Sequence, residues 1–122
     1  MSTLNVANIS DGTDTVATGY VVSGSAKASF RYVQGTNTVL SSENVSSIVD
    51  DSAGEFTVNC ASAFLSVDTQ RLSGMIHQGT GRVIAARATG MTNSALPFRT
   101  SNQSATGDTD NTSSGAVIGD LA

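Results

Sequence analysis

The sequence predicts an all-β protein, an antiparallel β-sandwich of jelly-roll-like type with an extended N-terminal arm. Several short segments alternate apolar and polar residues with a period of two, which is typical of half-buried strands. Turn clusters rich in glycine, asparagine and aspartate separate these segments. Only 13% of the residues are charged and 5% are aromatic, with 12 glycines, so the composition offers little for long amphipathic helices.

We expect residues 1–22 to form the arm and residues 23–122 to form the sandwich domain. Early apolar residues in the arm are Leu4, Val6 and Ile9, which are followed by a turn signal, SDGT, and by a second extended segment that runs to residue 22. We interpret Leu4, Val6 and Ile9 as candidate contacts of an attachment or oligomerisation element. The alternative is a frayed terminus, because terminal residues are often poorly ordered.

Residues 26–59 are the centre of the prediction, read as three antiparallel strands in a row. In the first strand, Ala28, Phe30 and Tyr32 share one face. The segments that follow are turn 34–37, strand 38–40 with residues 44–49 after it, turn 50–54, and strand 55–60. Phe56 and Cys60 share a face of the last strand, so we expect this face to pack on the Phe30 face.

This central stretch carries a family resemblance. The runs GSAKA at 24–28, NVSSI at 44–48 and GEFTVN at 54–59 resemble a repeated pattern in bacteriophage virion proteins of the tail-fibre and appendage group, roughly GSAKAWVNFNGTGT…NVSSITDNGTGDYTVNF. Residues 9–13, 19–22 and 117–122 also resemble that group. Ser29 stands where the pattern has tryptophan, and Cys60 stands where it has phenylalanine or another apolar residue.

The resemblance implies a phage virion structural protein, made in the bacterial host cytoplasm and assembled as a homotrimer with other virion proteins of the capsid or tail. It leaves two functions open. In one, the protein is a small fibre or appendage tip that contacts a host surface glycan or protein. In the other, it is a capsid decoration, cement or head-fibre protein that stabilises the head without host binding. The short chain with its own Met1 favours a separate particle component in either case.

The second half of the chain predicts further strands, for a total of about seven to nine. Residues 70–78 and 82–88 both alternate, and Gly79-Thr80-Gly81 between them indicates a long hairpin. Residues 96–100 contain the single proline, Pro97, and are expected to form an edge strand or an extended segment, because proline donates no ladder bond. Residues 116–118 are the last strand.

Residues 101–114, SNQSATGDTDNTSS, contain no apolar residue larger than alanine, which indicates an exposed loop at the outer tip. The candidate residues for contact with a host or partner are Ser101, Asn102, Gln103, Asp108, Asp110 and Asn111.

Charge and cysteine content exclude several classes of partner. The net charge is −4 and only six residues are lysine or arginine, which argues against nucleic acid. We expect no membrane insertion and no signal peptide, since the apolar runs are short. The single cysteine, Cys60, excludes an internal disulfide; it reads as a small buried hydrophobe, the alternative being a reactive or intersubunit thiol.

We expect no catalytic residue, cofactor or resident metal, and therefore no enzyme. The sequence has one histidine, His77, and no G-x-S-x-G motif that would place a nucleophilic serine. We interpret His77 as a polar residue on the outer face of a strand; the alternative is one ligand of a threefold metal site in a trimer. Asp50, Asp51 and Glu55 are close in sequence, but they flank a turn where solvated acids are expected. The run DTDN at 108–111 is a weak match to a calcium loop.

Overall fold

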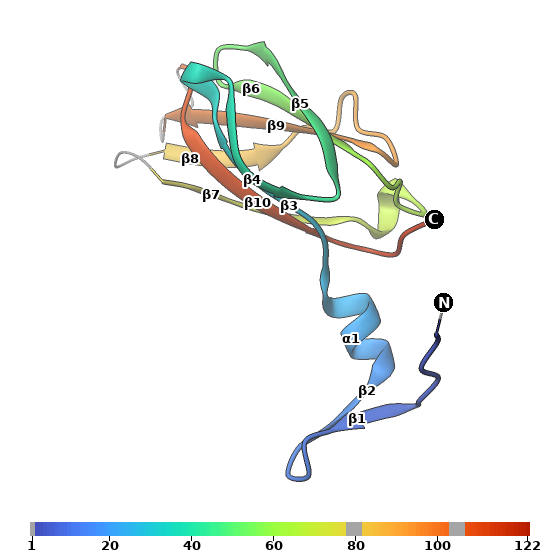
Figure 1. The fold of residues 1–122 in the computed structure, drawn as a ribbon. Coiled ribbons are helices and arrows are strands. Elements are labelled where there is room, and N and C mark those ends of the chain that lie inside the picture. Colours follow the sequence, from blue (N-terminus) through green and yellow to red (C-terminus); the bar gives the residue numbers. More distant parts are fainter. Residues whose placement is uncertain (1, 78–81, 103–106) are drawn as a thin grey trace.

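The computed structural model describes residues 2–77, 82–102 and 107–122. Eight strands form two four-stranded antiparallel sheets that pack face to face, and a separate two-stranded sheet lies in the N-terminal region (Figure 1). The predicted all-β class and antiparallel sandwich are therefore confirmed.

One sheet has the order β4-β3-β10-β7. Its strands are β3 (Ala26–Val33), β4 (Thr38–Glu43), β7 (Arg71–Ile76) and β10 (Thr112–Ile118). The other sheet has the order β5-β6-β9-β8. Its strands are β5 (Val45–Ser52), β6 (Glu55–Cys60), β8 (Arg82–Ala86) and β9 (Ala95–Asn102). Two short 3-10 helices, η1 (Gln34–Thr36) and η2 (Val67–Thr69), lie in connections between strands.

The central stretch contains four strands rather than the three predicted. β3 pairs with β4 in one sheet, and β5 pairs with β6 in the other. The chain crosses between the sheets at Asn44, which has a φ of 53°. The Asn44 side chain fixes this crossing, because its amide donates to the carbonyl of Lys27 at 2.9 Å and its oxygen accepts from the N–H of Ser62 at 2.7 Å. Asparagine tolerates the left-handed conformation better than most residues, but the sequence alone reads this position as a continued strand.

The predicted hairpin of residues 70–78 and 82–88 is wrong. β7 pairs with β10, whereas β8 pairs with β9 in the opposite sheet. Gly74 of β7 faces Ile84 of β8 across the interior, and a Cβ built on Gly74 would lie 3.0 Å from the Ile84 Cδ1. Alternation identifies a strand but not its partner, which explains the error. The predicted turn at residues 79–81 lies outside the described residues.

Pro97 lies in β9, an inner strand between β6 and β8, so the predicted edge position is also wrong. The carbonyl of Pro97 accepts from the N–H of Arg87 at 2.8 Å, one residue beyond the end of β8. In an antiparallel strand the N and O of one residue point to the same neighbour. The ring nitrogen therefore faces the side where β8 has ended, and no ladder bond to β6 is lost.

The core lies between the two sheets and is built around aromatic rings. The ring centroid of Phe30 lies 5.7 Å from that of Phe56 and 5.2 Å from that of Phe98. Tyr32 packs on Phe56 at 5.1 Å. The expected packing of the Phe30 and Phe56 faces is confirmed, and the predicted burial of Cys60 is confirmed as well.

The N-terminal elements lie away from the two sheets (Figure 1). They are β1 (Asn8–Ser10), β2 (Thr15–Ala17) and α1 (Thr18–Gly24). The sequence predicts an extended segment where α1 lies, and this expectation is wrong. Lys27 explains part of the difference, because its Nζ donates to the carbonyls of Val22 and Ser25 and so supplies a cation and donors at the C-terminal end of the helix.

Candidate functional site

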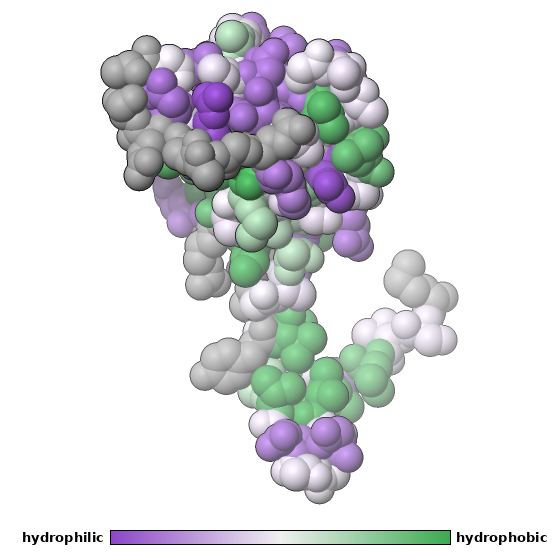
Figure 2. Space-filling view, turned by 90° about the vertical axis from the view of Figure 1, so that its left-hand side faces the viewer, coloured by the Kyte–Doolittle hydropathy of each residue, from purple (hydrophilic) through white to green (hydrophobic). Residues whose placement is uncertain are grey.

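The arm, which we define here as residues 2–24, exposes a set of apolar side chains. The predicted contacts Leu4, Val6 and Ile9 are exposed, Leu4 to 82%. The structure adds three exposed residues that the sequence interpretation did not single out, Val16, Val21 and Val22. Ile9 and Val16 are cross-strand partners and therefore share one face of the β1–β2 hairpin. Figure 2 shows hydrophobic residues gathered along the arm, with a hydrophilic tip beyond them.

Hydrogen bonds within the arm define its shape. In the β1–β2 turn, Oδ1 of Asp11 accepts from the backbone N–H groups of Thr13 and Asp14, each at 2.9 Å. The bonds from Asp14 and Thr13 lower the pKa of Asp11, because they favour its charged form. At the other end of the hairpin, the Thr18 hydroxyl donates to the carbonyls of Val6 and Ala7 at 2.8 and 3.0 Å.

These arm elements are short for independent structure. β1 and β2 have three residues each, and α1 has seven. A single two-stranded hairpin is marginally stable at best in water, and isolated helices shorter than about 12 residues are marginal as well. α1 also has no side-chain hydrogen bond at its N-cap, Ala17. A surface that covers the apolar side chains would therefore stabilise the arm.

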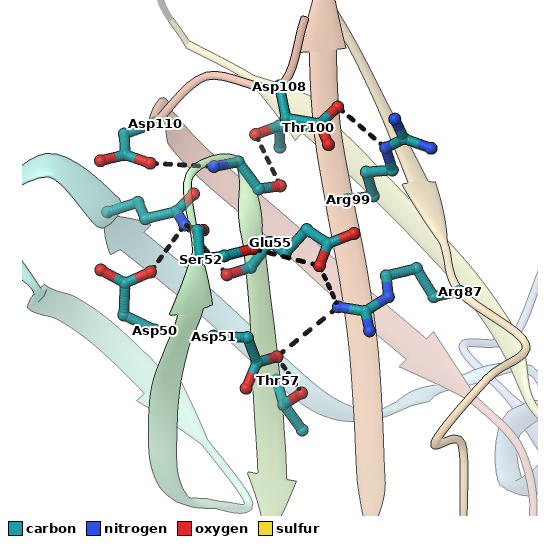
Figure 3. A network of polar contacts seen from close by, with 12 residues as sticks. Asp50, Asp51, Ser52, Glu55, Thr57, Arg87, Arg99, Thr100, Asp108 and Asp110 are labelled. Atoms are coloured by element: carbon teal, nitrogen blue, oxygen red, sulfur yellow. Dashed lines mark hydrogen bonds and ion pairs between the residues drawn. The ribbon is translucent and has the colours of Figure 1, made fainter.

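A polar network lies at the other end of β3 from the arm, where the β5–β6 turn meets residues 107–111 (Figure 3). The Gly54 N–H donates to Oδ1 of Asp110 at 2.9 Å, and the Gly54 carbonyl accepts from the N–H of Thr100 at 2.7 Å. Gly54 has a φ of 70°, and a Cβ at this position would lie 2.4 Å from the Thr100 carbonyl oxygen. Only glycine fits this position.

Gln34 links this turn to the end of β3. Its side chain is buried, and Nε2 lies 2.9 Å from Oδ1 of Asp50, 2.9 Å from the Ser52 carbonyl and 3.0 Å from the Glu55 carbonyl. The sequence interpretation reads Gln34 as a turn residue. Its hydrogen-bond partners lie between 16 and 21 positions farther along the chain, so no local sequence signal could have identified this role.

The acidic residues of this end are held by bonds within the fold. Nη1 of Arg87 lies 3.1 Å from a Glu55 carboxylate oxygen and 3.7 Å from one of Asp51 (Figure 3). The Thr57 hydroxyl donates to Asp51 at 2.6 Å. The sequence predicts solvated acids at a turn, whereas the structure pairs the carboxylates of Asp51 and Glu55 with Arg87.

The predicted contact loop is less exposed than expected. Ser101 is 7% exposed and Asn111 is 6% exposed, so the prediction of exposure is wrong for both. Ser101 lies within β9 opposite Val83, and Asn111 directly precedes β10. Polar residues at strand ends resemble a loop in sequence, which explains the error.

The other candidate residues of this loop differ among themselves. Asp108 is half-buried and accepts from Nε of Arg99 at 2.8 Å. Asp110 is exposed, and one of its oxygens binds the Gly54 N–H. Asn102 is half-buried in β9, and Gln103 lies outside the described residues. The structure therefore brings Asp108 and Asp110 to the β5–β6 turn but does not gather all six candidates on one open surface.

The remaining candidates for catalysis or metal binding, His77 and Cys60, show no arrangement, among the residues that the structure describes, with a partner that would activate them. His77 is exposed, with Nε2 2.8 Å from the Ser114 hydroxyl. Burial raises the pKa of the Cys60 thiol, which disfavours the reactive thiolate. Among residues 2–77, 82–102 and 107–122, no group of three or more histidine, cysteine, aspartate or glutamate side chains is arranged to hold a metal ion. Nor does any helix within these ranges have the length and apolar character needed to span a membrane.

Comparison with known proteins found no matching family model, no matching curated protein and no matching solved structure. The functional assignment therefore depends on the geometry of the two ends of β3 and on the residues that resemble the phage pattern.

Proposed function

We propose that this protein is a non-enzymatic structural subunit of a bacteriophage particle. It attaches through its N-terminal arm and presents the opposite end of the sandwich to the outside. The observation that carries this proposal is the arm itself, whose apolar side chains are exposed on elements too short to be stable alone. The resemblance of residues 24–28, 44–48 and 54–59 to phage virion proteins supports the same assignment.

The polarity of β3 supports attachment at one end and display at the other. α1 ends at Gly24, just before β3 begins at Ala26, and Gln34 with its polar network follows the end of the strand at Val33. Eight residues of strand separate the two ends by about 26 Å. A subunit held at the start of β3 would thus carry the β5–β6 turn and residues 107–111 at its far end.

We propose a small fibre or appendage tip as the particular role, with the far end in contact with a host surface. Asp110 is exposed there, and the network of Gly54, Gln34 and Thr100 makes a rigid base for it. A rigid base lowers the conformational entropy lost on binding a glycan or protein.

A second candidate, a capsid decoration or cement protein, is favoured by one observation. Ser101 and Asn111 are buried, and Asp108 is paired with Arg99, so several polar groups of the far end bind within the fold. A decoration protein needs an attachment surface and a stable fold but no receptor site.

Copy number distinguishes the two candidates. Quantitative mass spectrometry of purified virions, with the major capsid protein as the reference, would be compared with the same measurement on heads stripped of tails. Loss of the protein with the tails, at a few tens of copies or fewer, supports the appendage tip. Retention of hundreds of copies on the heads supports decoration, and absence from both preparations contradicts the virion assignment.

A further inference from the structure

The outer face of the β4-β3-β10-β7 sheet has features that match the arm. Phe30 and Val117 point into the core, so their neighbours along the strands point outward. We define the outer face by the residues Ser29, Arg31, Ser73, Met75, Ser114 and Ala116. Apart from Arg31 and Met75, these side chains are small; on the edge strand β4, Glu43, the cross-strand partner of Ser29, adds an exposed carboxylate to the same side of the sheet.

A shallow hollow lies on this outer face over β7 and β10. It has a volume of about 310 Å³ and is lined by residues 73–75 and 114–116. Gly74 and Gly115 are cross-strand partners whose backbone forms the floor of the hollow, because the Cβ positions of both point into the core, toward Ile84 and Phe30. Met75 stands beside the hollow and is 64% exposed, which leaves an apolar surface open to solvent.

Charge distinguishes the arm tip from this face. Asp11 and Asp14 at the tip are exposed, and neither forms an ion pair within the described part of the chain. Arg31 on the outer face is also exposed and, in the same described part, has no acidic partner within ion-pair distance. An apolar segment with an acidic tip thus complements an apolar hollow with a nearby arginine.

The arm does not use this face of its own chain. It extends away from the sheets in Figure 1 and exposes Ile9, Val16 and Val22. Packing of arm against arm in a parallel symmetric bundle would place Asp11 and Asp14 beside the same residues of the neighbour, and this like-charge contact is unfavourable. The outer face of a second copy offers a cation instead.

We infer that the arm of one subunit docks on the outer face of a second copy of this chain. Ile9 and Val16 cover the hollow beside Met75, and the carboxylates of Asp11 and Asp14 approach Arg31. This inference rests on the proposed role of the arm in attachment and names its partner. The interface is heterologous, arm to sheet, so successive copies form a ring where the rotation between them closes.

Mixed cross-linking tests the contact directly. Two populations would carry Cys60→Ala, so that each has one introduced thiol: Ile9→Cys in the first and Met75→Cys with a size tag in the second. After mixing and mild oxidation, we expect mainly cross-linked pairs of mixed mass. A parallel mixture with Val49→Cys, an exposed position in the other sheet, in place of Met75→Cys should give at least tenfold fewer pairs.

Other products would overturn the inference. Pairs of the Ile9→Cys population with itself would show arm-to-arm packing. Equal yields with Met75→Cys and Val49→Cys would show random collision, and no pairs at all would show that copies of the chain do not meet at this surface.

Charge exchange gives an independent test by sedimentation equilibrium of the full chain at about 50 mM salt, where surface charges are weakly screened. We expect Asp14→Arg and Arg31→Asp each to raise the dissociation constant of self-association about threefold to tenfold. The double variant should return to within about twofold of the original value. Additive weakening in the double variant would contradict the pairing of arm tip and outer face.

The two proposals can fail separately. If loss of the arm abolishes attachment to virions while neither test detects self-association, the arm docks on another virion protein. In that outcome the proposed function stands and this inference is wrong.

Discussion

The backbone N–H of Gly54 donates a 2.9 Å hydrogen bond to the carboxylate of Asp110, which lies 56 positions later in the chain. This bond joins the β5–β6 turn to the segment that enters β10, so it connects the two sheets at the far end of the sandwich. The β5–β6 turn is anchored a second time by Gln34, from the end of β3. The end that we propose to be displayed is therefore held by long-range contacts rather than by local turn chemistry.

Gly54→Ala should destabilise the fold by roughly 2–4 kcal/mol, because it adds a Cβ against a backbone oxygen as well as strain from a positive φ. Gly90→Ala is the matched control. Gly90 has a φ of 83° but open space around its Cα, so its substitution should cost only about 1 kcal/mol of backbone strain. Urea unfolding of both variants measures the difference, and equal losses would contradict the close packing at Gly54.

Gln34→Leu should lower the free energy of unfolding by about 2–3 kcal/mol. The change removes the shared donor of three hydrogen bonds, to Oδ1 of Asp50 and to two backbone carbonyls, and places a buried apolar side chain against those acceptors. Thr36→Ala, in the same 3-10 helix but exposed, should change stability by less than about 0.5 kcal/mol. A loss at Gln34 no larger than that at Thr36 would mean that the turn is held by other bonds.

Phe56→Ala should cost roughly 3–5 kcal/mol, since Phe56 is fully buried and contacts three aromatic rings. Val49→Ala on the adjacent β5 is the control, because Val49 is largely exposed and should have little effect. Chemical denaturation measures both changes. A loss below 1 kcal/mol for Phe56→Ala would place that ring outside the core.

Stability should fall at high pH because of Tyr32. Burial, with a smaller contribution from the nearby Asp50 charge, raises the pKa of Tyr32 to about 12 from its ordinary value of 10. The unfolded chain loses the phenol proton first, so this contribution is complete below about pH 10 and is lost as pH rises toward 12. The melting temperature should fall less steeply over this range for Tyr32→Phe than for the unaltered protein. Identical slopes for the unaltered protein and Tyr32→Phe would contradict the shift.

The sequence predicts the core of this fold well, for a physical reason. Phe30, Tyr32, Phe56 and Val58 recur at alternate positions, and burial of one sheet face requires that pattern. A local pattern of alternating residues does not determine which strands pair, so the prediction that β7 and β8 form a hairpin was wrong. Gly79 and Gly81, which lie between these strands in the sequence, indicate a turn but do not indicate which sheet the following strand joins.

The candidate sites were predicted unevenly. The structure exposes the side chains of Leu4, Val6 and Ile9, and their role in attachment stays a prediction. Ser101 and Asn111 were placed on the surface because polar residues are mostly exposed. Both are buried because strand ends and the Gly54 network surround them, and those contacts depend on distant parts of the chain.

Attachment through the arm is the central claim, and the most direct measurement is the amount of an arm variant that virions incorporate. Leu4, Ile9, Val21 and Val22 would be changed together to serine and compared with a control in which four exposed apolar residues of the sandwich, Val39, Leu40, Val49 and Val83, are changed to serine. We expect incorporation of the arm variant, measured by quantitative mass spectrometry of purified particles, to fall at least tenfold, while the control stays within about twofold of the original. Normal incorporation of the arm variant, with loss of the control, would contradict the account and place attachment on the sandwich.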